Sequence, residues 1–368
     1  MIHLVTSRGT ILVVLSVISL ALAASLAFAP LNRPANRRLA ALLIVLCGMS
    51  ASYTIGLARL DIGHAWIRYL PLSVPLAVGP LLYGYIRRLT HGAGEPRAWL
   101  HFVPAAIQLA YLIGFLALPA HVRNVLDDGR GRDWVRGLLE AAVLISLAAY
   151  SSAGLRLLGP YRAWLSQTRS DEDLYAARWI RNLLAVLLVT LAGQAAIRAW
   201  GWLAGRLDVF DVYGFYLWLA AIGVYLGIEG RRYADRRFPH LTENLPEEPG
   251  APAKVRDWTA VGEEWRRRTV EAGWWRTPSL TLADLARLLG TNTSHLSRAI
   301  NEGLGRNFSE MINGMRAEEV ARRLDADAQG DLLEIALEAG FSSKASFNRA
   351  FRAVHGVSPS AYRARLRS

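Results

Sequence analysis

Cysteine and the usual metal-ligand patterns are nearly absent from this chain of 368 residues. Its one cysteine, Cys47, excludes a disulfide framework and a thiolate metal site within a single chain, and its apolar surroundings favour a small buried side chain over a redox group. The eight histidines include no pair four residues apart, and neither an HExxH motif nor a glycine-rich phosphate loop occurs. These absences argue against an enzyme, and the sequence predicts no cofactor and no metal site.

Acidic residues are also few, with 30 Asp and Glu against 42 Lys and Arg and a net charge of +12. This excess does not by itself indicate nucleic acid, because residues 260–368 hold 16 basic and 13 acidic residues and thus only +3 of it. The rest lies among apolar segments, where arginines in loops set membrane orientation. With 52% hydrophobic residues, the composition points to membrane segments.

Seven apolar stretches in the first 230 residues are the main positive feature of the sequence. They cover approximately residues 10–29, 39–58, 69–86, 99–119, 138–157, 180–203 and 209–228. Most approach the roughly 20 residues that cross about 30 Å of hydrocarbon as a helix. A secretory signal with small-residue cleavage at Ala27–Ala29 is the alternative for the first, although its apolar run is longer than such signals have. Pro71, Pro75 and Pro80 should interrupt the third.

Arginines in the loops between these stretches predict the orientation. With the N-terminus outside, the inner side carries 15 of them and the outer side 8, as the positive-inside rule requires. An odd number of spans then delivers the C-terminal segment to the cytoplasm. The expected location is the inner (plasma) membrane, multi-pass, with the N-terminus outside and the C-terminal domain cytoplasmic.

Few polar side chains lie within the apolar stretches. Such groups are costly at membrane depth and often functional, so ligand sensing is one hypothesis for a small set of them. The set is Gln108, Gln194, Arg198, Asp211 and Tyr216. The alternative is structural, because Arg198 and Asp211 lie near the ends of stretches, where charges reach the interface and aromatic residues form a belt.

The segment after Gly230, "RRYADRRFPHLTENLPEEPGAPAKV", changes composition abruptly. Four arginines in seven residues suit the anionic cytoplasmic surface of a bilayer. Residues 246–253, rich in Pro, Glu and Gly, predict a linker, and a helix is expected through about 257–273. The predicted domains are therefore 1–230 (seven-span, sensing), 231–257 (basic juxtamembrane segment and linker) and 258–368.

The last 110 or so residues contain an internal repeat. "TLADLARLLG" (281–290) aligns with "DLLEIALEAG" (331–340), so that Ala286 matches Ala336 and Gly290 matches Gly340. After a slip of one residue in the turn, "LSRAI" (296–300) aligns with "FNRAF" (347–351). Each copy predicts a helix, a turn at a glycine able to adopt positive φ, and a second helix.

Capping and periodicity support this interpretation. Each first helix begins with a capping pattern, Thr281-x-x-Asp284 and Asp331-x-x-Glu334. Each second helix carries an apolar pair four residues apart, which should face the core and leave the opposite face free. These pairs are Leu296 with Ile300 and Phe347 with Phe351.

One helix should separate the two copies. "SEMINGMRAEEVARRL" (309–324) is expected to be helical, with Glu318–Arg322 and Glu319–Arg323 as ion pairs. About 16 residues make a rod of about 24 Å, which could hold two reader helices near the spacing of successive major grooves. Ser358-Pro359 predicts the start of a last short helix.

Residues from about 260 to 368 resemble the C-terminal DNA-binding domain of AraC-type (AraC/XylS) transcription regulators. "LTLADLARLLGTNTSHLSRAINEGLG" and "EIALEAGFSSKASFNRAFRAVHGVSPSAYR" are similar to the two helix-turn-helix segments of that family, the second being its signature region. More loosely, "GPLLYGYIRRLTHGAGEPRAWLHFVPAAI" is similar to the multi-span N-terminal region of membrane-bound members. The resemblance implies two recognition helices that enter adjacent major grooves on one face of DNA.

The resemblance also implies, by position, which side chains contact DNA. Bases would be read by Ser294, Ser297 and Arg298 from the first helix and by Lys344, Asn348 and Arg349 from the second, with Ser343 and Arg352 nearer phosphates. Because Ser294 and Ser297 are short, the first helix would discriminate little between sequences. The alternative for Arg298 and Arg349 is an ordinary solvated helix face.

The expected fold is all-α: a seven-helix transmembrane bundle followed by a cytoplasmic all-helical domain with two helix-turn-helix motifs. The predicted function is a membrane-anchored, sequence-specific DNA-binding transcription regulator that couples a signal at the membrane to promoter binding. Its expected partners are promoter DNA and the lipid bilayer, with a homodimer and an unidentified small-molecule or envelope signal as further candidates. The alternative is a membrane transporter or receptor whose C-terminal repeat makes protein contacts, which predicts no salt-dependent binding to duplex DNA.

Overall fold

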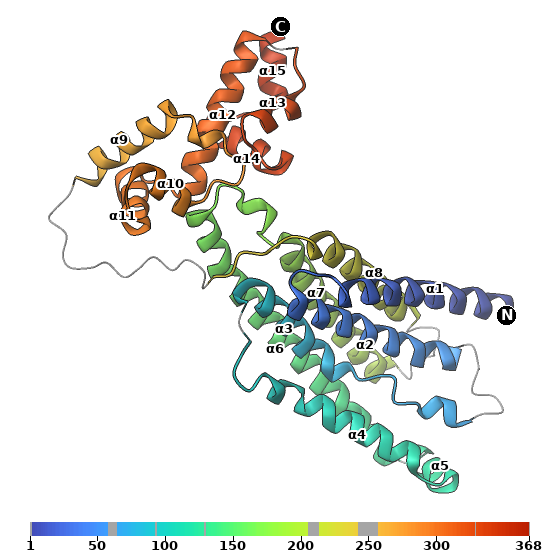
Figure 1. The fold of residues 1–368 in the computed structure, drawn as a ribbon. Helices are drawn as coiled ribbons and strands as arrows, with labels where there is room; N and C mark the ends of the chain where they lie inside the picture. Colours follow the sequence, from blue (N-terminus) through green and yellow to red (C-terminus); the bar gives the residue numbers. More distant parts are fainter. Residues whose placement is uncertain are drawn as a thin grey trace. The chain divides into compact units, whose positions relative to one another are not determined.

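The structure is a computed structural model that describes residues 2–57, 65–92, 94–128, 130–204, 213–241, 257–327 and 329–367. Within these ranges the elements are helices, as expected (Figure 1). The chain divides into two compact units, residues 1–157 with 179–240 and residues 158–178 with 241–368. The predicted linker at 246–253 lies outside the described residues.

The first unit is built from long apolar helices. Its α-helices are α1 (Ile2–Ala27), α2 (Arg33–Leu57), α3 (Val78–His91), α4 (Val103–Ala117), α5 (Ala120–Asp128), α6 (Arg130–Thr168), α7 (Arg178–Ala204) and α8 (Tyr213–Ala234). Short 3₁₀ turns, η1 (Ala65–Tyr69), η2 (Pro75–Ala77) and η3 (Ala98–Phe102), lie between them. The last turns of α6, from residue 158 onward, belong to the second unit.

Glycines on α8 permit close packing in the first unit. Helix α1 packs on both α2 and α8, and the three run side by side in Figure 1. A Cβ at Gly227 would lie 2.7 Å from Leu22 Cδ1 of α1, and one at Gly230 would lie 2.2 Å from Leu39 Cδ2 of α2. These glycines therefore let leucine side chains of α1 and α2 pack directly on the backbone of α8, and small residues of this kind are common where membrane helices pack.

The third apolar stretch is broken, as Pro71 and Pro75 predicted, whereas Pro80 lies in the first turn of α3 and does not interrupt it. Residues 70–74 are not helical, η2 begins at Pro75, and α3 starts only at Val78. The break exposes backbone groups that need partners, and the buried Gln108 of α4 supplies one, because its Oε1 accepts from the Leu76 amide at 3.2 Å. Gln108, a candidate for ligand sensing, thus has a structural role here.

Four helical stretches among the described residues are long and apolar enough to cross a membrane. They are Gly9–Ala27, Arg33–Leu57, Ala98–Ala117 and Gly137–Thr168. They match the first, second, fourth and fifth predicted spans. The other three predictions correspond to α3, α7 and α8, and α3 has 14 residues, fewer than the roughly 20 that a straight crossing requires.

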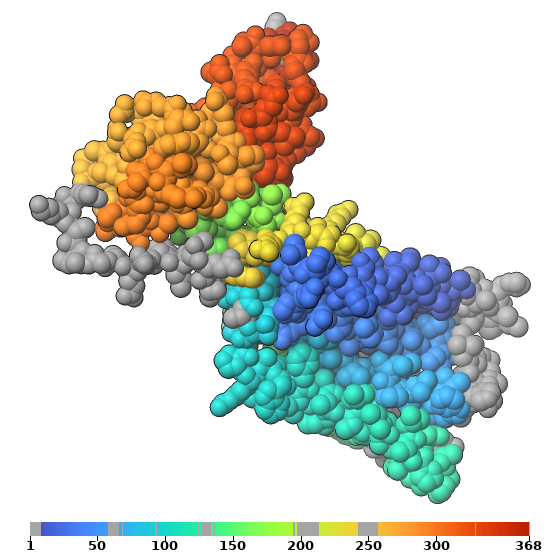
Figure 2. All heavy atoms as spheres, viewed as in Figure 1, coloured from blue at the N-terminus to red at the C-terminus, as the bar shows by residue number. Residues whose placement is uncertain are grey.

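The second unit contains the C-terminal helices. They are α9 (Trp258–Glu271), α10 (Leu282–Leu289), α11 (Thr293–Arg298), α12 (Phe308–Ala326), α13 (Leu332–Glu338), α14 (Lys344–His355) and α15 (Pro359–Arg367). A 3₁₀ turn, η5 (Trp274–Arg276), follows α9, and a π-helical turn, η6 (Ala299–Gly303), extends α11. Figure 2 shows these elements as two lobes, an orange one with α9–α11 and a red one with α13–α15.

Helix α12 is the central element of this unit. It contributes Ile312, Val320 and Ala317, each at most 1% exposed, to a core that continues into α10, α11 and α14. The predicted helices at 257–273 and 309–324 are confirmed as α9 and α12, and Ser358 caps α15 through its Oγ, which accepts from the Ala361 amide at 3.2 Å.

One predicted ion pair is wrong. Glu319 accepts from Arg323 at 2.9 Å as expected, but Arg322 also binds Glu319, at 2.9 Å, instead of Glu318. The carboxylate of Glu319 is 8% exposed and attracts both arginines, whereas Glu318 turns toward a groove described below. The hydrogen bonds from Arg322 and Arg323 lower the pKa of Glu319 to about 2.

Candidate nucleic-acid interface

The first helix pair, α10 and α11, meets at a tight turn. Thr281 and Asp284 form the full capping box that the sequence predicted. Gly290, at φ 71°, ends α10 in the left-handed region, where a side chain would be strained. Asn292 then caps α11 by accepting from the His295 amide at 2.7 Å. Leu296 and Ile300 are buried in the core as expected.

The predicted reader residues of α11 are largely engaged within the unit. The Arg298 guanidinium donates to Glu302, with Nε 3.0 Å from Oε1, and lies 4.9 Å from the Trp258 ring centroid. The Ser297 hydroxyl accepts from Asn301 at 3.1 Å, and Ser294 is half-buried. Two of the three predicted readers of α11, Ser297 and Arg298, therefore already have hydrogen-bond partners within the unit.

The second helix pair, α13 and α14, repeats this arrangement with a different turn. Asp331 forms its half of the predicted capping pattern, accepting from the Leu333 and Glu334 amides at 2.7 and 3.1 Å. Gly340, at φ 92°, forms the turn, where an added Cβ would lie 2.4 Å from the Arg276 carbonyl oxygen. Phe347 and Phe351 point into the core as predicted, at 2% and 0% exposed.

The opposite face of α14 is exposed. Lys344, Asn348, Arg349 and Arg352 all lie there. Ser343 is the N-cap, because its Oγ accepts from the Ser346 amide at 3.1 Å, so its hydroxyl serves the helix itself. The structure thus brings four of the five predicted contacts of this helix onto one exposed cationic surface.

A groove of about 820 Å³ runs beside this surface, between α14 and α12. Basic and amide side chains line it, among them Arg306, Asn348, Arg349 and Arg352. Carboxylates line it too: Glu310 and Glu318 from α12, and Glu172 from the segment between α6 and α7. The acidic contribution from so distant a part of the sequence was not predicted.

Residues 158–178 were missed as part of this unit, because the sequence placed them in a loop of the membrane half. Ser170 is 1% exposed and forms a backbone hydrogen bond to Leu280, with its amide 3.1 Å from that carbonyl oxygen. Arg349 binds Asp173 of this segment, and its Nη2 lies 4.0 Å from Glu172 Oε1. In Figure 2 these green residues lie beside the orange elements of the same unit. No local pattern in the sequence signals this contact.

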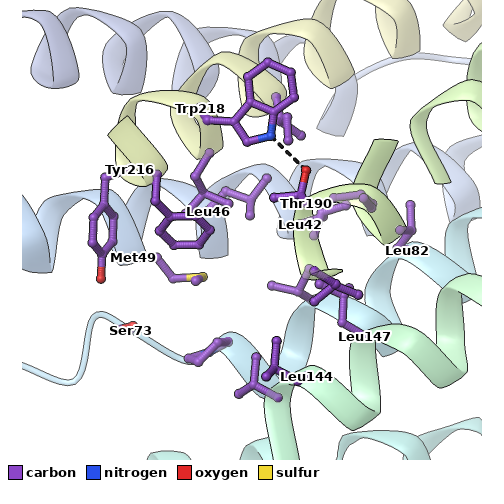
Figure 3. Close-up of a pocket in the computed structure, with 18 of the residues that line it drawn as sticks. Leu42, Leu46, Met49, Ser73, Leu82, Leu144, Leu147, Thr190, Tyr216 and Trp218 are labelled. Atoms are coloured by element: carbon purple, nitrogen blue, oxygen red, sulfur yellow. Dashed lines mark hydrogen bonds between the residues drawn. The ribbon is translucent and has the colours of Figure 1, made fainter. Parts of the chain in front are cut away.

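Within the first unit, residues of α2, α3, α6, α7 and α8 line a cavity of about 240 Å³ (Figure 3). Leu46 and Met49 face Leu144 and Leu147 across it, so its wall is mostly apolar. Its few polar groups include Glu140, Ser73 and Thr190, whose hydroxyl accepts from the Trp218 indole at 3.0 Å.

Of the five candidates for ligand sensing, Tyr216 lines this cavity and stacks on Tyr53 with ring centroids 4.1 Å apart. Gln108 is occupied at Leu76, as described above. The side chains of Gln194 and Arg198, and Asp211 entirely, lie outside the described residues. Among the residues the structure describes, no three His, Cys, Asp or Glu side chains are grouped to hold a metal ion.

Comparison with known families assigns the C-terminal elements. Residues 285–365 match the family described as the helix-turn-helix domain, and this segment is a helix-turn-helix domain of the AraC type. The match runs from α10 to α15 and includes both helix pairs described above.

Curated relatives share this region. An uncharacterized HTH-type transcriptional regulator of Staphylococcus aureus is 38% identical over 85 residues, which cover 23% of this chain and 11% of the relative. The HTH-type transcriptional activator AarP of Providencia stuartii is 36% identical over 87 residues, covering 24% of this chain and 64% of that protein. The chain thus spans about a tenth of the length of the S. aureus relative. No solved structure matches it.

Proposed function

We propose that this chain, whose residues 285–365 form an AraC-type helix-turn-helix domain, is a membrane-anchored transcription regulator that binds promoter DNA through two helix-turn-helix motifs. The observation that carries the proposal is the exposed cationic face of α14, with Lys344, Asn348, Arg349 and Arg352 projecting from a helix whose other face is core. A major groove about 12 Å wide admits one such helix, and these side chains match base edges and phosphates.

The two pairs contribute unequally in this proposal. Helix α14 supplies most of the base contacts, while α11, whose Arg298 is bound to Glu302 and Trp258, mainly positions the domain on the backbone. Helix α12 has 19 residues and is therefore about 28 Å long, which suits two reader helices in successive grooves.

Membrane anchoring rests on the long apolar helices of the first unit, for which we propose seven spans with the N-terminus outside. The apolar cavity is the proposed sensing site, with Tyr216 and Glu140 at its wall. Helix α6 lines this cavity with Leu144 and Leu147 and continues into residues 158–168 of the second unit, so one helix links the two.

The DNA claim is tested with the full chain in lipid nanodiscs and a pool of random-sequence duplexes of about 40 base pairs, long enough for two major-groove contacts. Binding should weaken steeply with salt, and sequencing of the bound duplexes should reveal a preferred motif. Replacing Lys344 and Asn348 by Ala together should weaken binding to that motif about tenfold or more.

Arg322→Ala is the control, because it removes an exposed cation of α12 that lies outside the predicted interface. Its affinity should stay close to that of the unaltered chain. Absence of salt-dependent duplex binding by the unaltered chain and all variants would favour a transporter or receptor with a protein-binding C-terminal repeat.

A further inference from the structure

Residues 169–173, between two helices of the membrane half, are built into the DNA-binding unit. Arg169 pairs with Thr281 in an antiparallel bridge. The next residue, Ser170, gives its amide and its hydroxyl to the Leu280 carbonyl oxygen, at 3.1 and 2.9 Å. The segment therefore joins the chain that leads into α10, directly before the first helix pair.

Helix α12 holds the same residue from the other side. The Asn313 amide donates to the Ser170 carbonyl oxygen at 2.9 Å, and Arg316 Nη2 donates to the Ser170 hydroxyl at 3.2 Å. All three side chains are buried, at 7% exposed or less. Every polar group of Ser170 is thus satisfied by the DNA-binding unit, as expected of a permanent joint rather than a passing contact.

Two carboxylates follow this joint and lie beside Arg349 of α14. Asp173, whose side chain is 4% exposed, binds Arg349 and also Arg178, the latter at 2.6 Å. Glu172 Oε1 is 4.0 Å from Arg349 Nη2. Burial and the neighbouring Asp173 raise the pKa of Glu172, whereas Arg349 opposes that rise. The arginine therefore offsets part of the electrostatic repulsion between the two carboxylates.

We infer that Glu172 and Asp173 form an intramolecular clamp that competes with DNA for Arg349 and keeps α14 in a low-affinity state. DNA phosphates and base acceptors need the same guanidinium that the clamp occupies. The two carboxylates also place negative charge where a phosphate backbone would approach, beside the groove lined by Arg306 and Arg352. This inference rests on the proposed function and concerns the regulation of the same surface.

The clamp is connected to the membrane half on both sides. Helix α6 precedes the segment and α7 follows it from Arg178, the residue that shares Asp173 with Arg349. Pro160 lies inside α6, where it removes the amide that would bind the Arg156 carbonyl. A change in α7, which begins at Arg178, would therefore move the carboxylates relative to Ser170, which stays fixed on α12.

The test compares DNA affinities of the full chain in lipid nanodiscs, with labelled random-sequence duplexes of about 40 base pairs as the probe. The variant Glu172→Gln with Asp173→Asn removes both charges and keeps the side-chain volumes. This variant should bind DNA about tenfold more tightly, because Arg349 becomes available and the repulsion between the carboxylates and the DNA phosphates is lost. The slope of log K against log salt concentration should become steeper by about one unit.

The matched control removes two carboxylates that flank another arginine of the same unit. Glu264 and Glu271 both bind Arg267 on α9, at 2.5 and 3.3 Å, so Glu264→Gln with Glu271→Gln makes the same charge change away from α14. Equal tightening in this control would show a general charge effect and overturn the clamp. Adding Arg349→Ala to the clamp variant should return its affinity to about that of the unaltered chain, and failure to do so would also overturn it.

Because Asp173 also binds Arg178, Glu172→Gln alone serves as a variant that leaves this buried pair and the Ser170 joint intact. It should tighten binding by a smaller factor, about threefold. If the unaltered chain binds DNA and neither clamp variant binds more tightly, the clamp is wrong and the proposed function stands. If no variant binds any duplex, the proposed function itself fails.

Discussion

Arg316 is completely buried in the centre of α12. Its guanidinium donates to the carbonyl oxygens of Trp275 and Thr277, at 2.8 and 2.6 Å, and to the side chains of Asn313 and Ser170. Burial lowers its pKa to about 10, so it remains a cation at neutral pH. One side chain thus satisfies acceptors in the turn after α9, in α12 and in the segment between α6 and α7.

Replacing Arg316 by Ala should therefore destabilise the C-terminal unit. Several buried acceptors would lose their donor, which together should cost about 3 kcal/mol. Amide hydrogen exchange of α12 in the full chain should accelerate by about two orders of magnitude. Arg322→Ala on the same helix removes an exposed guanidinium and leaves Glu319 with Arg323 as its partner, so exchange should accelerate far less. Comparable exchange in both variants would contradict a stabilising role for the Arg316 network.

At the scale of elements, α9 crosses η6 at backbone distance. A Cβ on Gly262 of α9 would lie 2.7 Å from the Ala299 carbonyl oxygen and 3.0 Å from Leu304 Cγ. A backbone oxygen cannot rotate away as a flexible side chain can. The glycine therefore fixes how closely α9 approaches the end of α11, where Trp258 meets Arg298.

Gly262→Ala should loosen this crossing and cost about 1–3 kcal/mol, because the helices must separate. Gly314→Ala is the matched control in α12, since the nearest atom to its added Cβ is Arg306 Nη1 at 3.8 Å. That change should be neutral or stabilising by up to about 1 kcal/mol. Pulse proteolysis of the tagged full chain measures the change in stability of both variants. Equal resistance of the two variants would show that the close approach is dispensable.

Local elements of the C-terminal unit could be predicted from the sequence because their signals are local. The capping box at Thr281, the turn glycine Gly340 and the apolar pair Phe347 and Phe351 all follow from residues a few positions apart. The partners of Arg316 and Arg349 could not, because Ser170 and Asp173 precede them by 146 and 176 residues. Arg322 pairs with Glu319 instead of Glu318 for a similar reason, because helical spacing allows both partners and tertiary packing selects one.

At the scale of the whole molecule, the joint at Ser170 constrains the topology. The hydrogen bond from Asn313 to Ser170 requires residues 158–178 and the C-terminal helices to lie on one side of any membrane. Helices α7 and α8 lie between them in sequence, so both must cross or neither. This parity agrees with a seven-span chain, and also with one in which only the four stretches named above as long and apolar enough cross.

The position of the N-terminus distinguishes these two arrangements. Seven spans place five crossings before residue 158 and put the N-terminus on the opposite side from Ser170, whereas four crossings put both on the same side. Labelling of introduced cysteines can measure this position, because Cys47 is the single cysteine and Cys47→Ala gives a background without a thiol. Into this background we would introduce His3→Cys, Gln167→Cys and Ser360→Cys one at a time.

We expect a membrane-impermeant maleimide to label His3→Cys in intact cells, since the arginine distribution places the N-terminus outside. Gln167→Cys and Ser360→Cys should react only after permeabilisation, because a DNA-binding unit and the segment joined to it must both face the cytoplasm. Labelling of all three after permeabilisation is the control for reactivity. Protection of His3→Cys in intact cells would exclude seven spans, and opposite behaviour of Gln167→Cys and Ser360→Cys would break the joint at Ser170, and with it the clamp on Arg349.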